Sequence, residues 1–174
     1  MSIVSDIEKL KKEKNAVILA HYYVDEDVQD VADYIGDSFY LSKVATKVSQ
    51  DRIIFAGVEF MGESAKILNP KKRVFMPDMN ADCPMAHMAD KDEILALREK
   101  YDDLAVVCYI NSTAELKKYS DVCVTSSNAV KIVKNLPNKN IFFIPDRNLG
   151  SYVAKQCPDK NFIFNNGCCP RHVV

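Results

Sequence analysis

The stretch Ala16-Val17-Ile18-Leu19-Ala20 is short, entirely apolar and free of the polar alternation that a half-exposed strand would show. Such a run is typical of a strand that is buried on both faces, and therefore of a parallel sheet. Further short apolar runs, many of their residues β-branched or aromatic, follow at Arg52–Ala56, Arg73–Met76, Leu104–Tyr109, Val122–Val124, Asn140–Ile144 and Asn161–Phe164.

Helical patterns fill most of the segments between these runs. Three segments begin with a capping signal, in which a carboxylate follows a Ser or Asp by three residues: Ser5–Glu8, Asp90–Glu93 and Ser112–Glu115. Two apolar stripes have helical spacing, one at Val28, Val31, Ala32 and Ile35, the other at Leu41, Val44, Ala45 and Val48. Strands that alternate with helices predict an α/β fold with parallel sheets and helices on both sides.

The chain also repeats itself. The segment from Arg52 to Asp78 has the same order of strand, helix, strand and Pro-Asp as the segment from Asp121 to Asp146. We therefore expect three-layer α/β/α units at residues 1–90 and 91–160. The strand Asn161–Phe164 is interpreted as the first strand of a third unit at residues 161–174, so the chain is expected to be truncated.

Charge and composition favour a small-molecule function. The formal net charge is −1, and basic and acidic residues are interleaved, which argues against a nucleic-acid or anionic-lipid surface. No apolar run approaches membrane-spanning length, and the first residues lack the apolar core of a secretory signal, so we expect a cytoplasmic protein. Six cysteines in such a chain are expected to be reduced.

Polar clusters follow the predicted strands. In parallel α/β sheets, ligands bind at the carboxyl ends of strands, near helix N-termini. His21-Tyr22-Tyr23, Tyr109-Ile110-Asn111 and Thr125-Ser126-Ser127-Asn128 stand at such ends, where they could grip a small anionic substrate. Simpler roles stay open: the serines could be helix caps, and His21 could be a structural histidine.

The cysteines fall into two groups. Cys108 and Cys123 lie inside apolar runs and are interpreted as small core residues, and Cys157 as inert. Cys83 and the Cys168–Cys169 pair lie in loops beside Pro or Gly. The chain has no Cys-x-x-Cys motif, so a metal site would have to be assembled from distant loops.

Eight motifs in series resemble those of the quinolinate synthase family, and they cover essentially the whole chain. They are Ala20–Tyr23, Val28–Ser38, Phe60–Ala65, Ala81–Ala86, Tyr109–Ala114, Thr125–Ala129, Ile144–Gly150 and Gly167-x-Cys169-x-x-His172. The resemblance implies three similar α/β domains around a pseudo-threefold axis, with the active site where the domains meet.

The resemblance also implies the chemistry. The family condenses iminoaspartate with dihydroxyacetone phosphate to quinolinate in NAD biosynthesis, with loss of phosphate and two waters. It uses a [4Fe-4S] cluster as Lewis acid, held by one Cys from each domain. Cys83 would be the first ligand and Cys169 the second, with its neighbour Cys168 as the alternative; the third has no counterpart in this chain.

The same resemblance assigns roles to the polar clusters. Catalytic roles fall to His21, Tyr23, Tyr109 and His172, and substrate-binding roles to His21, Ser38, Tyr109, Ile110, Asn111 and Ser126. Either an L-aspartate oxidase or an aspartate dehydrogenase would supply the iminoaspartate.

Two other functions compete with this one. A non-enzymatic fragment could keep a dicarboxylate or phosphate pocket, and a zinc or thiol-redox protein could use Cys83 with Cys168 and Cys169. Since most of a third domain would be missing, we expect that residues 1–174 alone neither hold a stable cluster nor make quinolinate.

Overall fold

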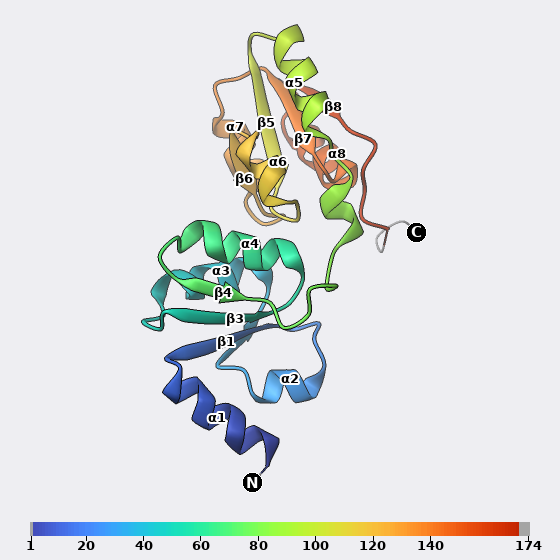
Figure 1. The fold of residues 1–174 in the computed structure, drawn as a ribbon. Helices are drawn as coiled ribbons and strands as arrows, with labels where there is room; N and C mark the ends of the chain where they lie inside the picture. Colours follow the sequence, from blue (N-terminus) through green and yellow to red (C-terminus); the bar gives the residue numbers. More distant parts are fainter. Residues whose placement is uncertain (1, 171–174) are drawn as a thin grey trace. The chain divides into compact units, whose positions relative to one another are not determined.

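The computed structural model describes residues 2–170 of the chain. It divides into two compact units, Met1–Asp82 and Cys83–Val174, and each is an α/β unit with its own four-stranded sheet (Figure 1).

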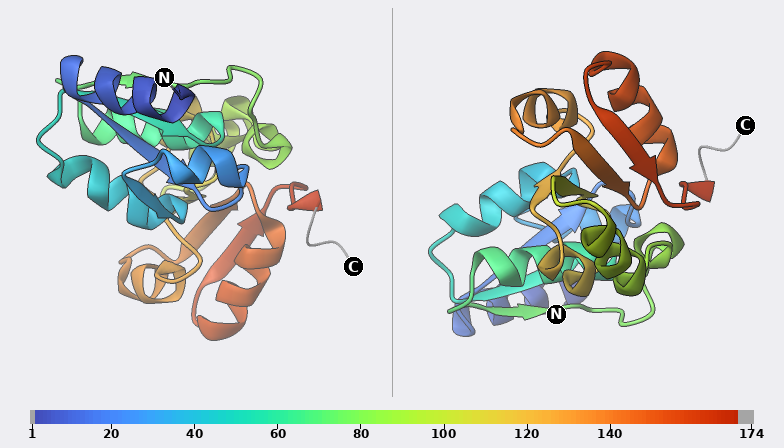
Figure 2. Two further views of the ribbon diagram at one scale, coloured as in Figure 1. Left: turned by 90° about the horizontal axis from the view of Figure 1, so that it is seen from below. Right: turned by 90° about the horizontal axis from the view of Figure 1, so that it is seen from above.

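All strands of the first unit are parallel, and the sheet has the order β2-β1-β3-β4. Helices α3 and α4 pack together on one face of this sheet, and α1 and α2 lie on the other (Figures 1 and 2). The elements are α1 (Ile3–Glu13), β1 (Ala16–His21), α2 (Glu26–Asp30), β2 (Tyr34–Gly36), α3 (Ser38–Lys47), β3 (Arg52–Ala56), α4 (Glu59–Leu68) and β4 (Arg73–Phe75).

The second unit repeats the same strand order, β6-β5-β7-β8, again with every pair parallel. Its elements are the 3-10 turn η1 (Pro84–His87), α5 (Lys91–Lys100), β5 (Leu104–Tyr109), α6 (Ala114–Lys118), β6 (Val122–Val124), α7 (Ala129–Asn135), β7 (Asn140–Ile144), α8 (Arg147–Gln156) and β8 (Asn161–Phe164). The predicted α/β fold with parallel sheets is confirmed.

The strand Asn161–Phe164 does not open a third sheet. As β8 it pairs with β7 in parallel, from Asn140 opposite Asn161 to Phe143 opposite Phe164. The expectation for this strand was wrong because an apolar run shows that a strand is buried without showing which neighbour it pairs with.

The apolar stripe that runs to Ile35 is not one helix. Helix α2 ends at Asp30, and Tyr34–Gly36 form the edge strand β2. Asp33 makes the change: its N–H donates to Ile18 O at 2.9 Å, and its Oδ2 accepts from Ile18 N–H at 2.8 Å. These bonds draw the chain against β1 and start the new strand.

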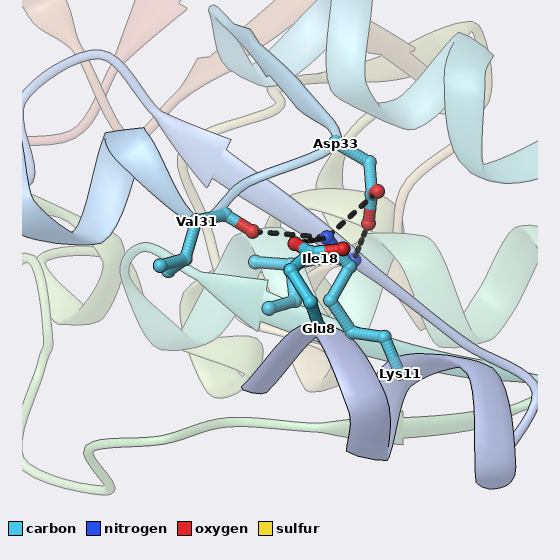
Figure 3. Close-up of polar contacts among 5 residues, drawn as sticks. All are labelled: Glu8, Lys11, Ile18, Val31 and Asp33. Atoms are coloured by element: carbon cyan, nitrogen blue, oxygen red, sulfur yellow. Dashed lines mark hydrogen bonds and ion pairs between the residues drawn. The ribbon is translucent and has the colours of Figure 1, made fainter. Parts of the chain in front are cut away.

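A lysine from α1 completes this junction. Lys11 Nζ lies 2.9 Å from Asp33 Oδ1 and 2.6 Å from Glu8 Oε1, and it donates to Val31 O at 3.1 Å (Figure 3). Burial lowers the pKa of Lys11, but the hydrogen bonds to Glu8 and Asp33 outweigh it, so the pKa lies above its usual value. The lysine therefore stays charged and ties α1 to the turn before β2.

The second unit contains an equivalent junction between a helix, the central strand and the turn before the edge strand, built partly from different residue types. Asp121 N–H donates to Val106 O at 3.0 Å, and Asp121 Oδ2 accepts from Val106 N–H at 2.7 Å. Arg98, on α5, donates to Asp121 Oδ2 at 3.0 Å and to Tyr119 O at 2.9 Å. Ile18 and Val106, like Asp33 and Asp121, are 88 residues apart, which aligns the two units.

A second lysine contact also occurs in both units. Lys72, just before β4, donates to Ala45 O at 3.0 Å and to Val48 O at 2.5 Å, at the end of α3. Lys160, just before β8, donates to Leu136 O and Asn138 O, both at 2.8 Å, beyond α7. Lys72 thus satisfies carbonyl groups at the end of α3, and Lys160 satisfies those of the turn that follows α7.

The second sheet has a buried core on each face. Alternate residues of β5 point to opposite sides, as a strand requires. Ala105 and Val107 pack with Val133 and Val153, on α7 and α8. The other core takes residues from α5 and α6 and consists of Ile94, Leu104, Val106, Cys108, Leu116, Phe142 and Ile144.

The helix starts were partly predicted. Asp90 caps α5 and accepts from Asp92 N–H, as expected. The other two starts were placed wrongly: Ser2 rather than Ser5 caps α1, and Thr113 rather than Ser112 caps α6. Within residues 2–170, no helix has both the length and the apolar character that crossing a membrane requires.

Candidate functional site

His21 ends the central strand β1 of the first unit and is 6% exposed, whereas Tyr23 beside it is 80% exposed. The rings of His21, Tyr22 and Tyr23 form a compact cluster with centroid separations of 4.5 to 4.6 Å. Tyr23 N–H donates to His21 Nδ1 at 3.3 Å. With Nδ1 accepting, a neutral imidazole carries its proton on Nε2.

Burial lowers the pKa of His21, and the nearby carboxylate of Asp37 opposes this only in part. The imidazole is therefore neutral at physiological pH. A neutral imidazole can donate a hydrogen bond from Nε2, or shuttle a proton once a substrate changes its surroundings.

Ser38 begins α3 at the carboxyl end of the edge strand β2. Asp37 caps this helix, since its side chain accepts from Tyr40 N–H at 2.7 Å. Ser38 is half-buried in the first turn, where unpaired N–H groups and the helix dipole favour an anion.

Tyr109 ends β5, the central strand that corresponds to β1, and hydrogen-bonds to Ser126 at the end of β6. Burial raises the pKa of the Tyr109 phenol, and negative charge on Asp146, Cys169 and Cys83 raises it further. The bond to Ser126 opposes the shift. The phenol therefore stays protonated and can donate to an anionic oxygen.

Asn111 lies two residues beyond Tyr109. Its Oδ1 is buried and has no hydrogen-bond partner within the described part of the chain. A buried acceptor without a donor costs about 1–3 kcal/mol, which a bound molecule with an O–H or N–H group would recover. Ile110 is different: its N–H donates to Val124 O at 2.8 Å, and its carbonyl accepts from Ser112 N–H.

The loop cysteines of the second unit lie near the same tyrosine. Cys83 comes just before η1, Cys169 follows β8, and both are half-buried. Each of them, when ionised, raises the pKa of the Tyr109 phenol, so both thiols lie within electrostatic reach of this tyrosine. Cys168 is half-buried as well, whereas His172 lies outside the described residues.

The predicted site residues of the two units occupy equivalent positions. His21, Tyr23 and Ser38 are followed 88 residues later by Tyr109, Asn111 and Ser126. The first member of each set of three is at the end of a central strand, and the third is beside an edge strand. The two units thus present polar groups at the same points of the same fold.

Two buried polar residues of the second unit that follow strands were missed by the sequence analysis. Asp146 caps α8, accepting from Asn148 N–H at 2.9 Å, and its charge acts on Tyr109. Asn165 donates to Met88 O at 2.8 Å, and its Oδ1 is buried without a partner in the described residues. The strand-end position of both was visible in sequence, but their burial was not.

A metal or cluster would need side chains that the described residues supply only in part. Across residues 2–170, no set of three His, Cys, Asp or Glu side chains is arranged to hold a metal ion. Cys83 and Cys169 are half-buried loop thiols, and each of them influences the Tyr109 phenol electrostatically.

These features define a class: a protein of repeated parallel α/β units that carries polar and thiol groups at the carboxyl ends of its strands. A family model described as "Quinolinate synthetase A protein" matches residues 5–174. The chain belongs to this family, and the resemblance seen in its motifs is confirmed.

Individual relatives agree. The chain is 65% identical over 169 residues to the quinolinate synthase of Fusobacterium nucleatum, covering 97% of this chain and 57% of the relative. It is 55% identical over 166 residues to that of Clostridioides difficile, covering 95% and 55%. It is 54% identical over 170 residues to that of Caldicellulosiruptor saccharolyticus, covering 98% and 56%. The chain thus spans little more than half the length of these relatives.

Proposed function

We propose that residues 1–174 form part of a cytoplasmic quinolinate synthase of NAD biosynthesis. The reaction condenses iminoaspartate with dihydroxyacetone phosphate, with loss of phosphate and two waters. Family membership supports this proposal, and one observation carries it: at the end of β5, the half-buried Tyr109 phenol stands two residues before Asn111, whose buried Oδ1 has no partner in the described residues. A donor and an unused acceptor at one strand end suit a substrate that carries both anionic oxygens and O–H or N–H groups.

Tyr109 and Asn111 would position substrate in the second unit. The raised pKa keeps the Tyr109 proton in place, so the phenol donates to a carboxylate or phosphate oxygen while Ser126 fixes its orientation. The partnerless Oδ1 of Asn111 would accept from a substrate hydroxyl or imine N–H. Together they recognise a molecule that carries both acceptors and donors.

His21, Tyr23 and Ser38 would act in the first unit. The neutral imidazole of His21 can take a proton while a triose phosphate enolises, or return one to a departing hydroxyl. Tyr23 supplies an exposed phenol beside it. Ser38 and the first turn of α3 would bind an anionic group.

Cys83 and Cys169 would hold a [4Fe-4S] cluster, with Cys168 as the alternative to Cys169. When bound, such a cluster supplies a Lewis-acidic iron that polarises substrate oxygens. We further propose that His172 takes part in proton transfer and that a third cysteine, matching no position in residues 1–174, completes the ligand set. An L-aspartate oxidase or an aspartate dehydrogenase would deliver the iminoaspartate.

Ligand binding tests the substrate part of this proposal. We would titrate the chain calorimetrically with a four-carbon dicarboxylate and, separately, with dihydroxyacetone phosphate. Asn111→Ala and Tyr109→Phe should each weaken binding of at least one ligand on the order of tenfold, the loss of about one hydrogen bond. The exposed Asn135→Ala is the matched control. Equal affinity in all four proteins would contradict the assigned roles.

Anaerobic treatment with iron and sulfide tests the ligand assignment. Two thiolates are expected to retain only substoichiometric iron, so the measured quantity is the residual iron that co-elutes with the chain: Cys83→Ser and Cys169→Ser should each reduce it, whereas Cys168→Ser should not. Iron loading that falls only with Cys168→Ser would transfer the ligand role to that residue.

A further inference from the structure

Cys108 and Cys123 face each other on neighbouring strands. Cys108 lies on the central strand β5 and Cys123 on the edge strand β6, and the two residues are directly in register. Neighbouring strands are about 4.8 Å apart, and residues in register point to the same face of the sheet. A separation of this size falls within the range of about 4.4–6.8 Å that a disulfide spans between Cα atoms.

The surroundings of the two thiols are unequal. Cys108 is completely buried, in the core beneath α5 and α6, while Cys123 is exposed. The Cys108 thiol is 2.8 Å from Ser112 Oγ and also hydrogen-bonds to Cys123. One sulfur is therefore accessible to a reagent, and the second lies behind it.

The exposed thiol, Cys123, is also the more acidic of the two. The hydrogen bond from Cys108 lowers the pKa of Cys123 to about 7, and the positive charge of Lys117 contributes although burial opposes it. The hydrogen bond to Cys123 and burial raise the pKa of Cys108 well above its usual value. At neutral pH about half of the exposed Cys123 sulfur is therefore thiolate, while the buried Cys108 keeps its proton.

The fold itself does not require sulfur at either position. The equivalent residues of the first unit are Ala20 and Ile35, which are also in register between β1 and β2. In the sheet of the first unit, a methyl group and an aliphatic side chain thus fill the places equivalent to those of Cys108 and Cys123. If Cys108 and Cys123 were only core residues, packing alone would not explain the hydrogen bond between them or the contact of Cys108 with Ser112.

We propose that Cys108 and Cys123 form a redox-active dithiol that is oxidised by a hydroperoxide. The Cys123 sulfur attacks one peroxide oxygen, the O–O bond breaks, and an alcohol or water leaves with a proton from solvent, which gives a sulfenic acid at Cys123. The Cys108 sulfur then attacks the Cys123 sulfur. The S–O bond breaks, and the hydroxyl leaves as water with the Cys108 proton.

The two thiols together lose two electrons, which reduce the peroxide. Thiol–disulfide exchange with a small dithiol restores them. Oxidation breaks the hydrogen bond between the Cys108 thiol and Ser112. Tyr109 and Asn111 are the sequence neighbours of these two residues, so oxidation should alter the position of the candidate site residues at the end of β5. The dithiol itself does not depend on the proposed reaction.

Mass spectrometry of the oxidised chain tests this proposal. Trypsin cuts after Lys117 and Lys118, which places the two cysteines on different peptides. After one equivalent of hydrogen peroxide and N-ethylmaleimide quenching, we expect these peptides to be disulfide-linked, and dithiothreitol to separate them. Iodoacetamide should modify Cys123 on the order of tenfold faster than Cys157 at pH 7.

The first unit supplies the variants. Cys108→Ala copies Ala20 and should let the sulfenic acid at Cys123 accumulate, so that dimedone traps it there. Cys123→Ile copies Ile35 and should abolish both products, while Cys157→Ala should keep the linked peptides. Circular dichroism confirms folding of each variant. Oxidation confined to Cys83, Cys168 and Cys169, with Cys123 recovered as the free thiol, would overturn the proposal, and since no substrate is present, it would leave the proposed reaction untouched.

Discussion

Lys11 Nζ lies 2.9 Å from Asp33 Oδ1, and through this contact α1 is joined to the turn that starts β2. Because Asp33 also accepts from Ile18 N–H, Asp33→Ala removes the partners of a main-chain donor and of a charged side chain. We expect a loss of about 1–3 kcal/mol in the free energy of unfolding of the first unit.

Amide hydrogen exchange measures this loss locally. The Ile18 amide should exchange on the order of tenfold faster in Asp33→Ala, since about 1.4 kcal/mol corresponds to a factor of ten. Asp121→Ala should do the same to Val106 in the second unit. Asp30→Ala, at an exposed position at the end of α2, serves as control. Unchanged exchange at both amides would show that these junctions add nothing to stability.

His21 should titrate below 6.5. Because its folded pKa is lowered, the unfolded chain binds the proton first as the pH falls through 6.5, so His21 stabilises the fold at neutral pH and that contribution is lost toward acid. Proton NMR of the imidazole gives the midpoint. Asp37→Asn keeps a good helix cap but removes the charge that opposes the shift, so the midpoint should fall further. A midpoint above 6.5 in the unmodified chain would refute the account.

Tyr109 should ionise later than an ordinary tyrosine. Ser126→Ala removes the hydrogen bond that lowers its pKa, so the tyrosinate should form at higher pH. Asp146→Asn removes a negative charge and should shift the titration in the opposite direction. Near-ultraviolet absorbance follows the transition, with Ser127→Ala as the neighbouring control. Shifts of the same sign in Ser126→Ala and Asp146→Asn would contradict this electrostatic description.

Gly62 and Gly150 occupy equivalent positions in α4 and α8 but should respond differently to alanine. A Cβ at Gly150 would lie 2.8 Å from Phe164 and 2.9 Å from Phe143, whose rings are part of the core and cannot move easily. At Gly62 the added methyl would meet the flexible side chain of Met76. We expect Gly150→Ala to cost about 1–3 kcal/mol by overpacking, whereas Gly62→Ala should be near neutral because helix propensity offsets the contact. Thermal unfolding compares the two, and equal shifts would argue against the packing argument.

Within residues 2–170, seven of the eight strands could be predicted from sequence because each contains a short apolar run, whether the strand is buried, as β1, β5 and β7 are, or more exposed, as β4 and β8 are. Tyr34–Gly36 was missed because its one aliphatic residue, Ile35, continued the helical stripe that precedes it. The place of Asn161–Phe164 was missed because pairing partners are a property of the folded chain.

The candidate site was predictable in the same limited sense. Strand ends could be located, so His21, Tyr109 and Asn111 could be named. Sequence could not show that Asn111 Oδ1 would be buried without a donor, or that Cys83 and Cys169 would both act on one phenol. Such properties arise from neighbours that are distant in sequence.

Lys72 and Lys160 hold carbonyl oxygens rather than side chains. Every amino acid offers a carbonyl, so the residues that supply these acceptors, Ala45 and Val48 in one unit and Leu136 and Asn138 in the other, can be exchanged without loss of the bond. The sequences of the two units can therefore diverge until a sequence comparison detects little similarity between them. The repeat is then recognised mainly from the equivalent contact that each lysine makes.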